Sequence, residues 1–573
     1  MKQLVTDLLS HLKIKVAGLI IAGTLVSFSA QAQLSEKTHF DISKYLDIYN
    51  AVFKELNMFY VDSIDVKKTI EDDIAFMLSR LDPYTEYFSE EDLPNFEEQT
   101  TGEYAGVGAV ISQFKDGKIY VREPYEGMPA ALAGLQAGDV LLEIDGISLD
   151  GKDSSFASDH LKGQPNTNVK IKFQRAGESK PREIVIARKR IQLNPVIYHG
   201  VLPGDIGYVY LSNFTTHSAS SVIDAFDDLK TNHGIQSLIF DVRDNGGGSV
   251  QDCLEILNYF LPKGDTLLTM KGKFHQLDRT YSATQQPVAP DMPLAVLVNQ
   301  SSASASEILS GALQDLDRAV IIGSRTFGKG LVQSPRQLPY NLSMKVTTAK
   351  YYIPSGRNIQ AIDYSHRNDD ESVSYIPDSL TSVFYTSKGR PVRDGGGITP
   401  DFVTDTKKLP TIIYYMENDN LFFDFVSSWR VKHPNIASPE QFVLSDKDYD
   451  DFKAFVQSKN FNYDRQSEKA LKNLKDIMDF EGYLPSASAE FTALENKLKP
   501  DLNRDLDFYK NILSDRLAKE IMRQYYYAKG VIIYSLRNDN NLKKAIEVLS
   551  DKNLYTNTLN GKPAVDKQPE AVQ

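Results

Sequence analysis

From about residue 196 the chain alternates short apolar strands with amphipathic segments, and this alternation limits the possible folds more than any other feature. We predict strands at 206–211, 237–242, 294–298, 319–322 and 344–352. Strands separated by helical segments favour a parallel or mixed sheet that is covered by helices. The fold class predicted for this part of the chain is therefore α/β.

The remaining segments have different periodicities. Residues 38–92 and those after Pro400 have helical spacing of apolar side chains. Residues 100–190 contain short strands at 109–112, 118–121 and 169–175, and a small-residue helix near 130–133. These changes predict the following divisions: a signal at 1–32, a helical region at 38–95, a small domain at 100–190, a core at 196–404, a helical domain at 405–555 and a flexible tail at 556–573.

The first 32 residues have the pattern of a secretion signal. Lysines precede the apolar run 16–28, and Ala30-Gln31-Ala32 supplies the small residues of a cleavage site. A retained membrane anchor is the alternative, but an anchor requires about 20 apolar residues and this run is shorter. We therefore expect cleavage after Ala32 and an exported protein of the periplasm or cell envelope.

Charge and cysteine content exclude several classes of function. The net charge of −12, without any dense block of Lys and Arg, argues against nucleic acid as a partner. Cys253 is the only cysteine, so an internal disulfide and a cysteine-based zinc site are both excluded. Because Cys253 lies in an apolar helical pattern, we expect it to be buried and to have no role in catalysis. We predict no metal and no other cofactor.

The most informative segment is 299–309, Asn-Gln-Ser-Ser-Ala-Ser-Ala-Ser-Glu-Ile-Leu, which follows the strand 294–298 and begins a helix. Ser304 and Glu307 fit a capping box, which alone would explain both residues. A serine at such a corner is also exposed at the carboxyl edge of the sheet, where free N–H groups can stabilise an oxyanion. The two interpretations are compatible, but a nucleophilic serine still needs a base.

Lys329 is the best candidate for that base. None of the nine histidines lies near the serine segment, and His199, His217 and His233 could reach it only through the fold. A lysine base at neutral pH requires a pKa near 7 rather than about 10.4, a change of roughly 4 kcal/mol. Burial beside apolar side chains can lower the pKa of a lysine in this way.

The segment around Lys329 nearly matches a phosphate-binding loop. Gly323, Gly328 and Lys329 have the required spacing, but Gly330 stands where a magnesium-binding Ser or Thr is needed. The residues that follow do not begin a helix, so we do not expect nucleotide binding.

Three glycine-rich segments are candidate elements for binding a ligand. The run Gly246-Gly247-Gly248 follows the strand 237–242, although by itself it is also consistent with a flexible loop. The turn Gly106-Val107-Gly108 precedes the strand that begins with Ala109 and Val110, and a second glycine-rich turn lies at 134–146. Together these two turns are typical of a PDZ domain, which binds an extended peptide beside a strand.

In combination, the motifs resemble the carboxyl-terminal processing proteases, also called tail-specific proteases, from about residue 42 to residue 401. The similarity rests on Leu-Asp-Pro-Tyr at 81–84, the PDZ pattern, Asp-x-Arg-x-Asn-Gly-Gly-Gly at 241–248, Ser-Ala-Ser-Ala-Ser-Glu at 302–307 and Thr-Phe-Gly-Lys-Gly-x-Val-Gln at 326–333. The resemblance implies a crotonase-like core with an inserted PDZ domain.

The same resemblance implies the role of each site residue. Ser304 is the nucleophile, Lys329 is the general base in register 25 positions later, and Gln333 orients the lysine. The backbone N–H groups of Gly248 and Ala305 form the oxyanion hole. Polar residues at 307 and 315 are expected to support the site without reacting.

We therefore expect an envelope serine endopeptidase that cleaves proteins near their carboxyl termini, with a PDZ domain that recognises apolar termini. A catalytically inert periplasmic PDZ scaffold and a histidine-based hydrolase are the alternatives. The helical region 405–555 departs from the family pattern, since many relatives end soon after the core. We expect it to pack on the core or form an oligomer, or to bind an adaptor protein.

Overall fold

The computed structural model describes residues 36–89, 92, 98, 100–368, 370–404, 409–498 and 501–561. The chain divides into two compact units, 1–87 and 88–573, which are described separately. The predicted signal at 1–32 lies outside the described residues, as does the tail after residue 561.

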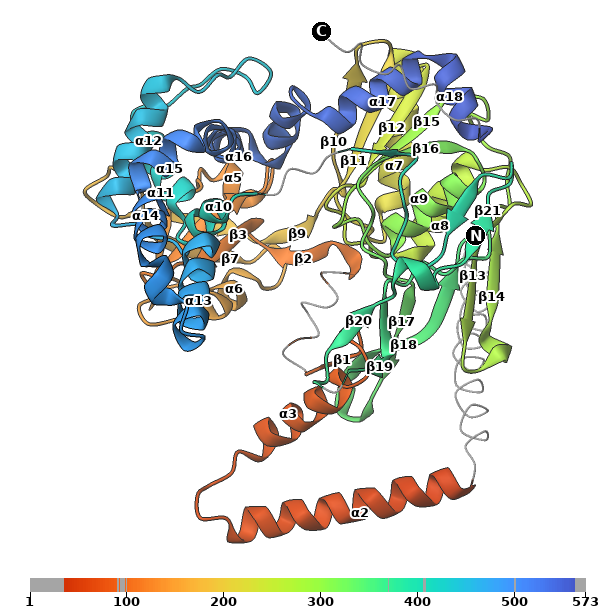
Figure 1. Cartoon of the computed structure of the whole chain (residues 1–573), viewed down its shortest axis with the longest axis horizontal. Helices are drawn as coiled ribbons and strands as arrows, with labels where there is room; N and C mark the ends of the chain where they lie inside the picture. The colour runs from red at the N-terminus through yellow and green to blue at the C-terminus, as the bar shows by residue number, and fades with distance from the viewer. Residues whose placement is uncertain are drawn as a thin grey trace, which may run out of the picture. The chain divides into compact units, whose positions relative to one another are not determined.

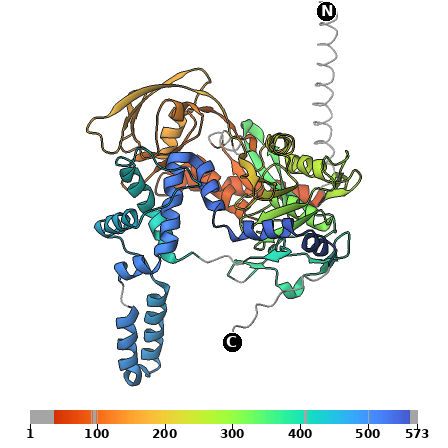
Figure 2. The same ribbon diagram turned by 90° about the horizontal axis from the view of Figure 1, so that it is seen from above.

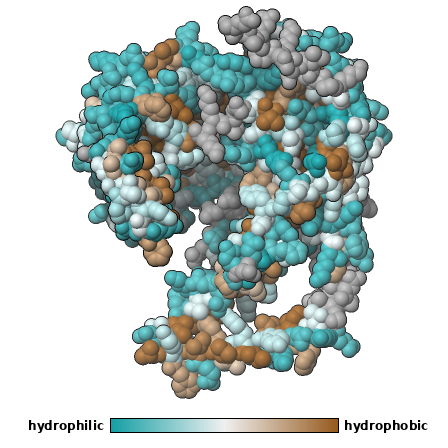
Figure 3. Space-filling view, viewed as in Figure 1, coloured by the Kyte–Doolittle hydropathy of each residue, from teal (hydrophilic) through white to brown (hydrophobic). Residues whose placement is uncertain are grey.

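The first unit consists of two helices, α2 (Glu36–Phe59) and α3 (Val66–Ser79), followed by the strand β1 (Glu86–Phe88), which ends just beyond it. Large apolar side chains are exposed along α2, and they form the brown surface at the bottom of Figure 3. The Tyr49 hydroxyl donates to Asp73 of α3 at 2.8 Å. In the turn after α3, the Asp82 carboxylate accepts from the N–H groups of Tyr84 and Thr85, both at 2.8 Å.

The PDZ region is a small sheet with the order β3-β4-β5-β7-β8, and β6 pairs with β5. Figure 1 labels two of its strands, β3 and β7. Its strands are β3 (Ala109–Gln113), β4 (Ile119–Pro124), β5 (Val140–Ile144), β6 (Ile147–Ser148), β7 (Asn168–Gln174) and β8 (Arg182–Ala187). Two helices, α5 (Pro129–Leu132) and α6 (Ser154–Leu161), pack with this sheet around one apolar cluster. The strand β2 (Glu103–Gly106) precedes this region in the sequence and β9 (Lys189–Gln192) follows it, and the two strands pair antiparallel.

The central sheet of the core has the order β10-β11-β12-β15-β16-β23. Its strands are β10 (Val196–Leu202), β11 (Ile206–Leu211), β12 (Ser237–Asp241), β15 (Leu294–Val298), β16 (Ala319–Gly323) and β23 (Phe402–Val403). All neighbouring pairs are parallel except β10 with β11. The predicted mixed sheet with helices between its strands is confirmed.

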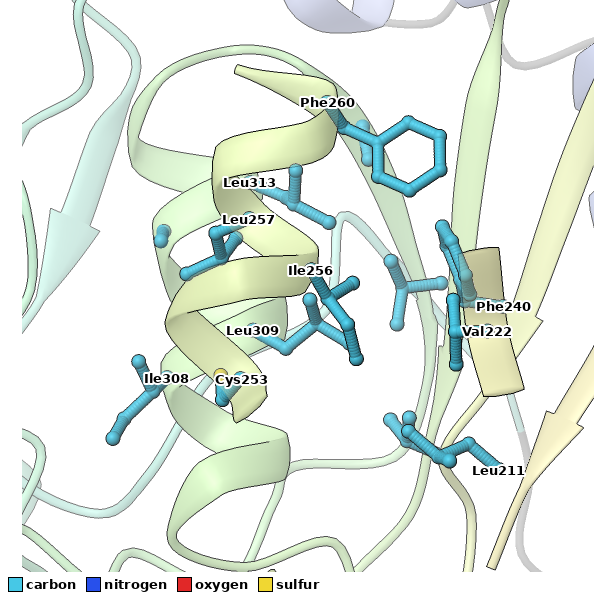
Figure 4. Packing of buried hydrophobic residues seen from close by; sticks show 14 of the residues in the cluster. Leu211, Val222, Phe240, Cys253, Ile256, Leu257, Phe260, Ile308, Leu309 and Leu313 are labelled. Atoms are coloured by element: carbon cyan, nitrogen blue, oxygen red, sulfur yellow. The ribbon is translucent and has the colours of Figure 1, made fainter. Parts of the chain in front are cut away.

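Helices cover both faces of this sheet, because side chains along a strand alternate between its faces. Leu238 and Phe240 pack against α7 (Ser218–His233), α8 (Val250–Phe260) and α9 (Ala305–Asp315), which Figure 4 shows in part. Ile239 faces the opposite side, where Leu542 and Val548 of α17 (Asn540–Ser550) contribute to a second cluster. The four middle strands are therefore buried on both faces, which explains their continuous apolar sequences.

A second sheet of the core has β18 (Ser343–Tyr352) between β17 (Leu331–Gln337) and β13 (Thr266–Gly272), and β14 (Arg279–Ser282) pairs with β13. The predicted strand at 344–352 therefore exists but belongs to this sheet. Two small hairpins follow, β19 (Ile362–Arg367) with β20 (Val373–Tyr375) and β21 (Val383–Tyr385) with β22 (Pro391–Arg393). Short 3-10 turns lie at His275–Leu277, Pro339–Asn341, Asp378–Leu380 and Leu484–Ala487.

The carboxyl-terminal region is helical, as predicted. Its helices are α10 (Thr411–Asn418), α11 (Leu421–Trp429), α12 (Asp446–Ser458), α13 (Gln466–Phe480), α14 (Ser488–Leu498), α15 (Leu502–Phe508), α16 (Lys510–Leu536), α17 (Asn540–Ser550) and α18 (Lys552–Leu559). Helices α13 and α14 form a projecting hairpin in Figure 2. Most of the others share one apolar cluster, whereas α17 and α18 pack on the central sheet.

Candidate active site

Ser304 lies at the corner between β15 and α9, as the sequence predicts. Its backbone has φ 55° and ψ −114°, a conformation that is costly for any residue other than glycine and that recurs at functional sites. The preceding turn is fixed in place, because Ser302 Oγ donates to the Val242 carbonyl at 2.8 Å and Ala303 N–H donates to the Asn245 carbonyl at 3.0 Å. The serine is half-buried, at the amino end of a fully buried helix.

The buried carboxylate of Glu307 organises this corner. One oxygen, Oε2, accepts from the backbone N–H groups of Ser304 at 3.0 Å and Lys329 at 2.9 Å. The other, Oε1, accepts from Thr326 Oγ1 at 2.6 Å and Gly328 N–H at 2.7 Å. Burial raises the pKa of Glu307 to about 7, while these hydrogen bonds act in the opposite direction. The predicted capping contact from Glu307 to the Ser304 N–H is therefore present, and the same carboxylate also bonds the lysine segment.

Lys329 lies in the loop from β16 to β17, so no helix follows it. The strand β17 follows the segment, in agreement with the prediction that no helix begins there. The Tyr351 hydroxyl contacts the backbone carbonyls of both Ser304 and Lys329. Two separate groups, a carboxylate and a phenol, thus bring the serine and lysine segments together. The hydrogen bonds among the described residues do not include one between Ser304 Oγ and Lys329 Nζ.

The glycine loop after β12 packs directly on the serine corner. A Cβ on Gly247, whose φ is +95°, would lie 2.7 Å from Ser304 Cβ and 2.9 Å from Ala305 N. Gly248 forms an isolated parallel β-bridge with Phe214. A Cβ on Gly248 would lie 2.0 Å from the Phe214 carbonyl oxygen. Only glycine fits at either position. Within the described part of the chain, the N–H groups of Gly248 and Ala305 donate to no protein acceptor.

Asn245 shapes this loop, a role that was not predicted from the sequence. Its buried side chain accepts from Gly247 N–H at 2.9 Å and donates to the Leu211 carbonyl at 2.8 Å. Tyr351 was also not predicted as a site residue. An amide that bonds its own loop and a tyrosine within a strand have no distinctive sequence pattern.

Two other predicted residues form hydrogen bonds with groups outside the serine corner. Gln333 Nε2 donates to Thr347 Oγ1 at 3.1 Å across the β17–β18 pair, and its orientation of Lys329 stays a prediction. Asp315 lies at the carboxyl end of α9, where its buried carboxylate accepts from Arg357 at 2.8 Å and from Ser355 N–H at 3.0 Å.

Cys253 and the histidines have other surroundings. The Cys253 thiol is fully buried beneath α9, and burial raises its pKa well above the ordinary value. His199 and His233 lie beside Asp228, and His217 Nε2 lies 2.8 Å from Glu103.

Among residues with described positions, no group of three or more His, Cys, Asp or Glu could bind a metal. No helix in the described ranges is long and apolar enough to cross a membrane.

A groove of about 430 Å³ lies between β3 and α6, and Val107, Ala109 and Val110 line it; their role in peptide binding stays a prediction. Gly108 has φ +76°, and a Cβ there would lie 2.5 Å from Met128 Cβ, so the turn requires glycine. Gly106 is less constrained, because a Cβ there would lie 3.0 Å from the ring of Tyr104, which a small movement of that side chain would relieve.

Tyr104 also lines the groove but was not predicted. Burial raises the pKa of its phenol above the ordinary value, and hydrogen bonds from Ala109 and Gly108 N–H oppose that rise. Its oxygen thus lies against the N–H groups that we expected to bind a peptide carboxylate.

The chain matches three family descriptions: "Peptidase family S41" at residues 205–365, "PDZ domain" at 120–175 and "Probable PDZ-protease, C-terminal helical domain" at 412–549. It is 34% identical over 352 residues to a carboxy-terminal-processing protease of Bartonella bacilliformis, a match to 61% of this chain and 79% of that protein. It is also 34% identical over 311 residues to a "Probable CtpA-like serine protease" of Staphylococcus aureus strain N315, covering 54% of this chain and 61% of that protein.

Among solved structures, the photosystem II D1 C-terminal processing protease is 28% identical, with a TM-score of 0.35, and the match covers 64% of this chain and 93% of that one. The family descriptions, together with the carboxy-terminal-processing relative, define a protease with a PDZ domain. The chain belongs to peptidase family S41, as a carboxyl-terminal processing protease with a PDZ domain.

Proposed function

We propose that the protein is a serine endopeptidase in which Ser304 is the nucleophile and Lys329 is the general base. Neutral Lys329 removes the hydroxyl proton, and Ser304 Oγ attacks the scissile carbonyl carbon. Lys329 then returns the proton to the leaving amine. In the second half of the reaction, the same lysine removes a proton from a water molecule, whose oxygen attacks the acyl carbon. The bond to Ser304 Oγ then breaks, the lysine returns the proton to that oxygen, and the acyl group leaves as a carboxylic acid.

The negative charge that develops on the carbonyl oxygen needs donors at the serine corner. We assign this role to the N–H groups of Gly248 and Ala305. The support is that the glycine loop packs on the serine corner, and that Ala305 is the first residue of α9. N–H groups at the start of a helix have no partner within that helix and can donate to an oxyanion.

One observation carries the proposed dyad: a single oxygen of Glu307 accepts from the backbone N–H groups of both Ser304 and Lys329. Residues far apart in the sequence are thereby fixed at one point. Hydrogen bonds between catalytic groups are often long before substrate binds and shorten in the complex with substrate, so the dyad does not require a hydrogen bond between the two side chains in the free protein. Gln333 is proposed to orient the lysine.

The PDZ groove supports binding of a substrate through its carboxyl terminus. An extended peptide would pair with β3, its apolar side chains would enter the groove, and its carboxylate would reach the N–H groups of Gly108 and Ala109. The Tyr104 phenol would have to leave these groups first. Together with the predicted secretion signal, this supports cleavage of envelope proteins with apolar termini.

Substitution of the two proposed catalytic residues tests the mechanism. Ser304→Ala and Lys329→Ala should each abolish cleavage of a protein with an apolar tail, without a change in melting temperature. Ser301→Ala, three residues before the nucleophile, and Lys350→Ala, on the strand β18 that pairs with β17, are controls at exposed positions and should remain active. An active Lys329→Ala protein would exclude this base, and inactive wild-type protein would favour the scaffold alternative.

The pH profile separates a lysine base from a histidine base. With a lysine, kcat/KM should continue to rise well above pH 7. A plateau reached by pH 7 that is lost on substitution of His217 would contradict the proposal. Fractionation of cells, followed by detection of the protein in the envelope fraction, tests the proposed location.

A further inference from the structure

Asp539 connects the carboxyl-terminal helices to the glycine loop of the active site. It precedes α17, and its Oδ1 accepts from the N–H groups of Asn541 at 2.9 Å and Leu542 at 3.1 Å. Its other oxygen, Oδ2, lies 2.6 Å from the guanidinium of Arg243. One carboxylate therefore both begins the helix that covers the sheet and binds a residue of the loop at 241–248.

Arg243 lies between two carboxylates. Its Nε donates to the buried Asp241 at 2.9 Å, and Asp241 also accepts from the Tyr208 hydroxyl at 2.6 Å. Burial alone would lower the pKa of Arg243, but Asp241 and Asp539 raise it well above the ordinary value. Loss of Asp539 would leave Arg243 with Asp241 as its one remaining carboxylate partner of the two. Arg243 lies two residues before Asn245 in the sequence, so a movement of Arg243 would be passed to Asn245. Asn245 in turn fixes both Gly247 and the turn before the nucleophile.

Glu123 of the PDZ strand β4 contacts the same helical region. Helix α16 is interrupted at Tyr527, which has φ 57° and ψ −166°. The interruption removes the intrahelical partner of Ala528 N–H, and Glu123 Oε1 accepts from that group at 3.0 Å. Its Oε2 lies 2.9 Å from Arg523. The PDZ domain thereby caps the second half of α16 and stabilises the strained backbone before it.

Glu123 is also close to the peptide groove. It is paired with Val110 of β3, the strand that a peptide would join. Two residues after it, the N–H of Tyr125 donates to the Gly108 carbonyl at 3.0 Å. Val110 and Tyr125 both line the groove. A peptide that binds in this groove would therefore contact the strand β3 and the turn after β4, which together hold Glu123 in place.

The helix between the two contacts is short and packed. From Ala528 the second half of α16 runs to Leu536, and Ile532 and Leu536 pack on the cluster beneath the central sheet. Asp539 follows three residues later. A shift at Ala528 therefore acts on Asp539 through one packed helical segment.

We propose that Asp539 and Glu123 are positioning residues, through which the carboxyl-terminal helices relay occupation of the PDZ groove to the oxyanion loop. Asp539 fixes the loop through Arg243, and Glu123 fixes the helix that leads to Asp539. The inference rests on the proposed function, since it assigns the loop at 241–248 to the oxyanion hole.

The first test compares two helix caps. Asp551 caps α18 by accepting from two N–H groups, as Asp539 does for α17, but it has no arginine partner among the described residues. We expect Asp539→Asn to lower kcat on a short peptide substrate by about tenfold or more, with little change in KM. Asp551→Asn should remain within twofold of the wild type, and Asp539→Glu should recover part of the loss. Equal effects of the two Asn variants would overturn the role of Asp539.

The second test needs no catalysis. In the Ser304→Ala protein, hydrogen exchange is measured over 241–250 and 528–541 with and without a short synthetic peptide that has apolar carboxyl-terminal residues. We expect the peptide to change exchange in both segments. Glu123→Ala should abolish both changes while the PDZ groove remains protected, whereas Glu126→Ala, an exposed neighbour, should keep them.

The outcomes separate this inference from the proposed function. No change over 241–250 in the Ser304→Ala protein, or a change that persists in Glu123→Ala, would overturn the relay. Conversely, if the exchange results are as expected but the Ser304→Ala protein still cleaves substrate, the assignment of the nucleophile fails and the relay stands. An amidated form of the same peptide, which lacks the terminal carboxylate, should give no change in exchange.

Discussion

Replacement of Glu307 by Gln should change both the stability of the protein and its dependence on pH. The four groups that donate to this carboxylate are the Thr326 hydroxyl and the N–H groups of Ser304, Gly328 and Lys329. A glutamine side chain has one acceptor oxygen, and its NH₂ cannot accept. In either amide orientation, at least one buried N–H loses its partner, at a cost of about 1–3 kcal/mol.

The pH dependence gives a sharper expectation. The folded-state pKa of Glu307 is about 7, above the ordinary value of 4.5, so the folded protein binds this proton more tightly than the unfolded chain does. The associated stabilisation is complete below pH 4.5 and is lost as the pH rises through 7. Between pH 5 and pH 8 the free energy of unfolding should fall by about 2.5 kcal/mol from this group alone.

Urea unfolding followed by far-ultraviolet circular dichroism, at pH 5 and at pH 8, provides the measurement. The Gln variant has no proton to lose at this position, so its stability should fall less between the two pH values than that of the wild type. A difference between the two proteins that is the same at both pH values would refute the reasoning. Glu255→Gln, on the exposed face of α8, is a matched control and should show no such effect.

Three further changes test the packing of the site. Gly247→Ala places a Cβ 2.7 Å from Ser304 Cβ, so kcat/KM should fall by about 10²-fold or more, measured with a peptide substrate; near-normal activity would contradict the described loop packing. Cys253 should not react with a thiol reagent until the core unfolds, because its side chain is fully buried; rapid labelling of native protein would contradict this position. Tyr351→Phe removes the hydroxyl that contacts the carbonyls of Ser304 and Lys329, and should lower both kcat and the free energy of unfolding, the latter by about 1 kcal/mol; unchanged kinetics would show that the phenol is dispensable.

Local sequence patterns were sufficient for the strands and for the nucleophile corner. The predicted strands at 206–211 and 294–298 agree with β11 and β15, because both consist of apolar residues that are buried on both faces of the sheet. The corner at Ser304 was predictable because a buried strand, a run of small residues and a helix start follow in order. The Glu307 contact with the Ser304 N–H was predictable for the same local reason.

Contacts between distant segments were not predictable. The Glu307 bonds to Gly328 and Lys329, and the contact of Tyr351 with the Lys329 carbonyl, depend on how β16, β17 and β18 meet in space. The packing of α17 on the central sheet has no sequence signal either, because an amphipathic helix does not specify the surface that it covers. The domain limits and the catalytic roles stay predictions.

The cover that α17 and α18 form over the central sheet has a consequence for the order of events in folding. One face of β11, β12, β15 and β16 is completed only by residues 542–559, near the end of the chain. This face of the sheet therefore cannot reach its final packing until synthesis has passed residue 559. A chain truncated before residue 542 would leave that face uncovered and exposed to other apolar segments.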